Sequence, residues 1–94
     1  MIKVLIERQL LEGLDEEYGH AAKALLRGCM EMPGYISGES LKDIQRPTHR
    51  VIITLWKNEQ SWKDWEKSAK RQQLLAGICG LLAADEKVTL LAPL

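Results

Sequence analysis

The stretch from Thr48 to Ser68 constrains the fold of this chain more than any other, because it contains a strand signal, a helix start and all three tryptophans. Its first part, Val51 to Trp56, is a run of β-branched and aromatic residues whose apolar side chains fall on both faces of a strand. Asn58 can then cap a new helix, in which Trp62 and Trp65 share one side. The sequence therefore predicts a strand that is buried on both faces and is followed at once by a helix.

Hydrophobic periodicity predicts a single domain with the order strand, helix, strand, strand, helix, strand. This is the split βαβ arrangement, an α+β ferredoxin-like fold with a four-stranded antiparallel sheet and its helices on one face. The second helix is expected to break at Ser68, whose side chain can cap a following segment. The expected elements are a strand at Ile2–Leu10, a helix from Asp15 to about Met30, strands at Tyr35–Ile44 (weakened near Gly38) and from Thr48, the broken helix, and a strand at Lys87–Leu91.

Charge and apolar run lengths exclude several kinds of partner. Thirteen basic and thirteen acidic residues are scattered along the 94 positions, so no electropositive face for a nucleic acid is expected. The apolar runs are too short to cross a membrane and the chain opens directly into a strand pattern, which favours a cytoplasmic protein. Cys29 and Cys79 lie on apolar helical stripes without a CxxC motif or a nearby histidine, so both are predicted to be buried thiols.

The uncovered face of the predicted sheet needs a partner. Helices can cover only one face, whereas Val4–Ile6 and Val51–Leu55 carry apolar side chains on both. A second copy of the chain, related by a two-fold axis, buries the remaining face most simply. We therefore expect an obligate homodimer that forms through the sheet face.

Three segments carry a resemblance to a known family. PGYISGES, HRVIITLWKNEQSWKDWEKS and the final VTLL resemble the antibiotic biosynthesis monooxygenase (ABM) domain family of dimeric α+β barrel proteins, over nearly the whole chain. The resemblance implies this fold and a homodimer. It implies the reaction less closely, because the family mixes cofactor-independent monooxygenases of aromatic polyketides, quinol monooxygenases and heme-degrading enzymes.

The heme-degrading members of that family share an asparagine, a tryptophan and an iron-binding histidine. Alignment places Glu7, Trp65 and Leu75 at those positions, so only the tryptophan is retained. Heme ligation in their manner would need a displaced ligand such as His49 or His20. The sequence has no GxGxxG, P-loop or histidine cluster, so neither a cofactor nor a metal is expected.

The leading interpretation is a cofactor-independent monooxygenase that oxidises a small aromatic or quinol-type substrate with O₂. In that chemistry the deprotonated substrate itself reduces O₂, so the protein supplies a dry pocket, a proton acceptor and charge stabilisation. Glu7 and His49 are the candidate proton acceptors, although Glu7 could instead be an edge residue or pair with an arginine. By the resemblance, Trp65 is the cavity tryptophan. The further candidates for substrate contact, each of which could instead be a core residue, are Tyr35, Trp56 and Trp62.

Two alternatives to this interpretation stay open. The chain could be a non-catalytic dimer that binds a small hydrophobic molecule or serves a stress or regulatory role, since a shared fold does not confer chemistry. It could also bind heme or another tetrapyrrole. A buried Glu7 or His49 that faces Trp65 would favour an enzyme, whereas a cavity without a perturbed titratable residue would favour binding.

Overall fold

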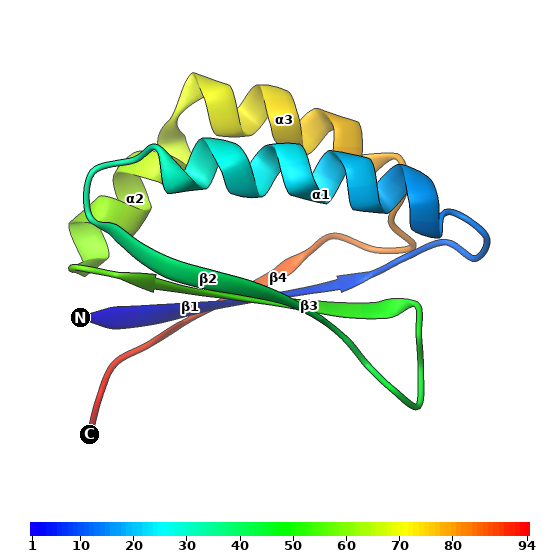
Figure 1. Ribbon diagram of the computed structural model, residues 1–94, viewed down its shortest axis with the longest axis horizontal. Coiled ribbons are helices and arrows are strands. Elements are labelled where there is room, and N and C mark those ends of the chain that lie inside the picture. The colour runs from blue at the N-terminus through cyan, green and yellow to red at the C-terminus, as the bar shows by residue number, and fades with distance from the viewer.

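Seven elements follow one another in the computed structural model, which describes residues 1–94 (Figure 1). Four strands form one antiparallel sheet, and the helices cover a single face of it, which confirms the predicted ferredoxin-like architecture. None of the helices is long and apolar enough to cross a bilayer. The elements are β1 (Ile2–Gln9), α1 (Asp15–Met30), β2 (Tyr35–Lys42), β3 (His49–Trp56), α2 (Glu59–Lys67), α3 (Ala69–Cys79) and β4 (Lys87–Leu91).

The sheet has the order β2-β3-β1-β4, so the first strand of the chain lies between β3 and β4. Leu5, for example, pairs with Ile53 on one side and with Thr89 on the other. Even-numbered positions of β1 and β3 point toward the helices, and all the buried residues of the two strands, such as Val4 and Ile6, are among them. Odd-numbered positions point to the open face, where they are only partly covered within one chain.

Two side-chain caps fix where α2 and α3 begin, as the sequence predicts. The Asn58 side chain accepts a hydrogen bond of 2.9 Å from the backbone N–H of Ser61 and starts α2. Ser68 separates α2 from α3, and its hydroxyl oxygen accepts from the N–H of Arg71 at 3.1 Å. The break turns the chain so that Arg71, in the first turn of α3, lies near the indole of Trp62 in α2.

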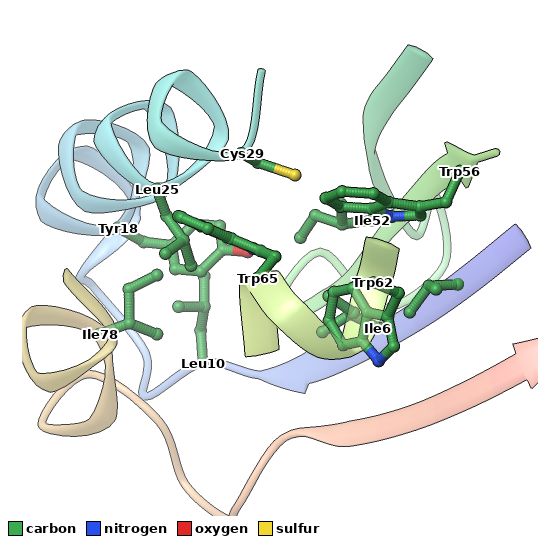
Figure 2. Packing of buried hydrophobic residues seen from close by; sticks show 11 residues of the cluster. Ile6, Leu10, Tyr18, Leu25, Cys29, Ile52, Trp56, Trp62, Trp65 and Ile78 are labelled. Atoms are coloured by element: carbon green, nitrogen blue, oxygen red, sulfur yellow. The ribbon is translucent and has the colours of Figure 1, made fainter. Parts of the chain in front are cut away.

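The core between the sheet and the helices contains all three indoles (Figure 2). Trp56 is fully buried and makes edge-on contacts with Tyr35 and Trp62, with ring centroids 5.6 and 5.9 Å apart. Cys29 belongs to the same cluster, but Cys79 is exposed. The prediction of two buried thiols is therefore wrong for Cys79, because its neighbour Ile78 occupies the buried face of α3 and the next position lies about 100° around the helix.

Candidate active site

A cavity of about 260 Å³ lies between the sheet and the helices. Its walls are aliphatic, aromatic and basic, and they contain no aspartate, glutamate or histidine. This volume lies just under the range of roughly 300–1,000 Å³ that is usual for small-molecule sites. The aromatic members of the wall are Tyr18, Trp62 and Trp65, and the basic members are Arg8, Lys23, Arg50 and Arg71.

The two indoles of α2 form the aromatic part of the wall. Trp62 and Trp65 are three positions apart on one side of the helix and are almost fully buried. The Trp65 ring reaches the backbone of α1 at Gly28, where an added Cβ would lie 2.9 Å from the Cη2 atom of Trp65. Because only glycine leaves room for this approach, Gly28 sets the depth at which Trp65 closes the cavity.

Two buried arginines share one carboxylate at the charged part of the wall. Arg8 Nε donates to Glu86 Oε2 and Arg71 Nη2 donates to Glu86 Oε1, both at 2.8 Å. Arg8 Nη1 also donates to the Tyr18 hydroxyl at 3.1 Å. The side chains of Arg8 and Arg71 are 2% and 4% exposed, and that of Glu86 is 13% exposed. The Arg8–Glu86–Arg71 triad therefore carries one positive charge in excess, in a region where water screens it little.

One donor of the triad has no acceptor. Arg71 Nε is buried and has no hydrogen-bond partner, while the guanidinium lies 5.3 Å from the centroid of the Trp62 ring. A buried donor that is left unsatisfied costs about 1–3 kcal/mol, and most such groups in proteins are paired. The wall thus holds a fixed positive charge at Arg71, and the Nε–H of this residue is enclosed beside the Trp62 ring.

The titratable groups around the cavity do not include a free base. Burial raises the pKa of the Cys29 thiol to about 12, although the charge of Arg71 acts against this, so the thiol is protonated at neutral pH. Burial also favours a raised pKa for Glu86, but the hydrogen bonds and charges of Arg71 and Arg8 outweigh it and lower the pKa. Glu86 is consequently an ionised partner of the arginines, and the wall is suited to stabilise an anion.

The family model described as antibiotic biosynthesis monooxygenase matches residues 1–76 of this chain. The chain belongs to this family. No curated protein matches it significantly in sequence. Glu86, the carboxylate of the triad, lies beyond the matched residues of this family member.

Solved structures of low sequence identity share the fold of this ABM domain. A crystal structure described as an antibiotic biosynthesis monooxygenase has a TM-score of 0.90 at 17% identity, with 100% of this chain and 99% of that chain covered. SnoaB, a cofactor-independent oxygenase from Streptomyces nogalater, has a TM-score of 0.86 at 12% identity, with coverage of 98% and 92%. Rv0793 from Mycobacterium tuberculosis has a TM-score of 0.87 at 16% identity, with coverage of 99% and 94%.

The structure brings together only part of the aromatic set that the sequence suggests. Trp65 and Trp62 line the cavity of the ABM domain, whereas Trp56 and Tyr35 do not. Trp56 is a core residue whose Nε1 donates to the Thr54 hydroxyl at 2.9 Å. Tyr35 packs against it from the start of β2. Substrate contact by the latter two residues therefore has no support in this geometry.

Glu7 and His49 lie on the open face of the sheet, away from Trp65 and the cavity. His49 Nε2 is 3.5 Å from Glu7 Oε1, and His49 Nδ1 is 2.9 Å from Asp43 Oδ2. The partner of Glu7 is thus a histidine and not an arginine. Neither group faces Trp65 within the single chain, because odd-numbered positions of β1 and β3 point away from the helices.

Sequence reasoning missed the charged wall of this ABM domain. Arg8 follows Val4 and Ile6 with a period of two, which places it on the buried face of its strand. Arg71 precedes Ile78 by seven positions and so shares the buried stripe of α3. The periodicity therefore indicated that each arginine lies on a buried face, but no local pattern in the sequence pairs either one with Glu86.

Proposed function

We propose that this protein is a cofactor-independent monooxygenase that oxidises a small aromatic or quinol-type substrate with O₂ in the cavity. The observation that carries the proposal is the composition of the wall, in which Trp62 and Trp65 adjoin a buried triad with an excess positive charge. Indoles suit the flat face of an aromatic ring, and guanidinium groups suit the negative charge that develops when it is oxidised. Membership of the ABM family supports the same reaction class.

The proposed reaction uses the electrons of the substrate itself. A bound anthrone-type CH₂ group loses a proton, and the resulting anion passes one electron to O₂. The substrate radical and superoxide combine to a peroxide anion, which takes a proton back from water to form the hydroperoxide. Loss of water then leaves a carbonyl group, so that R₂CH₂ and O₂ give R₂C=O and H₂O. An opposite charge within about 4–6 Å lowers the pKa of an acid, so the basic wall favours the substrate anion. Because no carboxylate or imidazole lines the cavity, the proton passes to water.

The proposal is tested by O₂ consumption with anthrone and with 1,4-dihydroxynaphthalene, each compared with the uncatalysed rate and with an anaerobic control. Trp65→Phe removes part of the cavity wall and should lower kcat/KM roughly tenfold while the protein stays folded. Trp56→Phe is the matched control, because Trp56 is equally buried but lies outside the cavity. Wild-type rates no higher than background, or equal effects of the two substitutions on kcat/KM, would contradict the proposal.

A non-catalytic domain that binds a small aromatic molecule is the second candidate. It is favoured by the lack of a side-chain base in the wall, where the Cys29 thiol is protonated. Ligand binding without O₂ consumption would identify this function.

The residues fit heme poorly. Leu75 stands where the heme-degrading relatives have a histidine, and neither His20 nor His49 lines the cavity. A hemin titration should therefore give no shift of the Soret band.

We also propose that the protein is a cytoplasmic homodimer. The unpaired thiols of Cys29 and Cys79 suit a reducing compartment. The open face of the sheet carries half-exposed apolar side chains on its central strands, and a second copy would remove them from water. Those at the centre of this face are Leu5, Val51, Ile53 and Leu55.

A further inference from the structure

The positive charges of the cavity wall are not fully neutralised by carboxylates. Of the basic residues in it, Arg8 and Arg71 share the single carboxylate of Glu86. Arg50 has a carboxylate partner only at the surface, where its Nη2 is 3.3 Å from Asp15, whose side chain is 71% exposed. Water weakens this outer pair far more than the buried one. An occupant of the cavity that carries one negative charge would therefore balance the buried triad.

The orientation of Arg71 is fixed on two sides. Its Nη2 is held by Glu86 at 2.8 Å, and its guanidinium packs against the ring of Trp62. The Nε–H is left as the buried donor without an acceptor. A charged oxygen is the acceptor that the guanidinium favours most, because the Coulomb attraction between the two charges adds to the hydrogen bond.

The indoles beside this donor define the rest of the ligand. Trp62 lines the cavity and packs against Arg71, and Trp65 lines the cavity beside it. A molecule with a flat apolar ring and one charged oxygen group at its end would place the ring against the indoles and the charge at Arg71. Phenols are mostly neutral at pH 7 and phosphate monoesters carry more than one charge, so a carboxylate best matches a single positive charge.

We propose that the cavity selects small aromatic carboxylates, with the carboxylate paired with the guanidinium of Arg71 and the ring lying against Trp62 and Trp65. This inference rests on the proposed function for its choice of site. Within it, Arg71 determines specificity through a charge that the substrate carries before any reaction. Arg50 and Lys23 remain available for the charge that develops during oxidation.

The binding test compares 2-naphthoate with its neutral counterpart 2-naphthamide by isothermal titration calorimetry at pH 7.5. The full-length protein should bind the carboxylate roughly tenfold or more tightly than the amide. Arg71→Gln should abolish this preference. Lys70→Gln is the matched control, because Lys70 is the adjacent residue of α3 and pairs with Glu31 at the surface. It removes the same charge and should keep the preference.

Three results would overturn the inference: equal affinities for carboxylate and amide, no binding of either compound, or a preference that survives Arg71→Gln. If Arg71→Gln does not fold, the comparison of the two ligands on the wild-type protein still decides, and Arg71→Lys, which keeps the charge but lacks the planar guanidinium, should reduce the preference. Because neither naphthalene derivative is a substrate for oxidation, this test is independent of turnover.

A second measurement separates the inference from the proposed function. O₂ consumption is followed with 1,4-dihydroxy-2-naphthoate and with 1,4-dihydroxynaphthalene, which differ only in the carboxylate. A kcat/KM at least tenfold higher for the carboxylated compound supports both proposals. Oxidation of both compounds with equal kcat/KM refutes the carboxylate site and supports the oxygenase. A preference in binding without any O₂ consumption supports the carboxylate site and refutes the oxygenase.

Discussion

Replacement of Glu86 by glutamine should weaken the fold and strengthen anion binding at the same time. Glu86 accepts hydrogen bonds from Arg8 and Arg71, both almost fully buried, and it is their only carboxylate partner. Removing one partner of a buried ion pair typically costs about 3–5 kcal/mol. Because the Glu86 side chain is 13% exposed and glutamine keeps one acceptor oxygen, we expect a loss of about 2–4 kcal/mol in the free energy of unfolding.

The same substitution adds one positive charge to the cavity wall. A carboxylate that lies behind the guanidinium, roughly 7 Å from a bound anion, repels it by about 2 kcal/mol at an effective dielectric constant near 20. Removing this repulsion should raise the affinity for 2-naphthoate by about tenfold to thirtyfold and leave that for 2-naphthamide unchanged. If Glu86 had only a structural role, its replacement would lower the affinities for both ligands. A loss of stability together with a gain in naphthoate affinity would therefore show that the triad acts on the ligand through its charge.

The assay is urea denaturation at one fixed protein concentration, because dimerisation would make stability depend on concentration. Asp85→Asn is the control, since Asp85 is the exposed neighbour of Glu86. An unfolding free energy within about 0.5 kcal/mol of wild type, or weaker binding of naphthoate, would refute the reasoning. The wild-type pH dependence gives a further check. The pKa of Glu86 is lower in the folded protein, so its contribution is present above the ordinary value near 4.5 and is lost as the pH falls through the folded pKa.

The remaining predictions concern packing, thiol reactivity and assembly. Gly34→Ala should destabilise the protein by about 2–4 kcal/mol in urea denaturation, because Gly34 has a φ of +87° and an added Cβ would overlap the Ser61 side chain of α2. Gly13→Ala, with a φ of +82° but open space around it, should cost only about 1 kcal/mol, and equal losses would contradict the close packing. Iodoacetamide at pH 8 should label Cys79 in the native protein and Cys29 only after unfolding, as peptide mass spectrometry would show; rapid native labelling of both would contradict the burial of the second thiol. Ile53→Glu should raise the dissociation constant of the proposed homodimer at least tenfold, as light scattering over a series of protein concentrations would show. A folded, fully dimeric variant would refute the sheet face as the interface.

The fold was predictable because its signals are local. The β-branched run before Trp56, the caps at Asn58 and Ser68, and the proline at position 33 after α1 each act within a few residues. Strand alternation also separated Glu7 from Val4 and Ile6 correctly. These signals are sufficient for element order and for which residues of a strand share a face.

The site was less predictable because it depends on contacts between distant segments. Period-two alternation shows that Glu7 and Arg8 point in opposite directions, but it does not show which direction leads to the helices. Only the packing of α1 and α3 on the even-numbered face assigns Arg8 to the cavity and Glu7 to the open side. The bridge through Glu86 joins residues 78 positions apart, and no local pattern encodes such a pair.

The position of β1 also has a consequence for how the protein is made. The strand that is synthesised first lies between β3 and β4, and it must wait for both before its backbone is paired on each edge. Contacts that close such long loops form late, since the loss of chain entropy precedes the gain. Glu86 directly precedes β4, so Arg8 and Arg71 gain their shared carboxylate only when that strand docks. Until then the two arginines lack the carboxylate that orients them, so the proposed O₂ chemistry would require molecules that have completed folding.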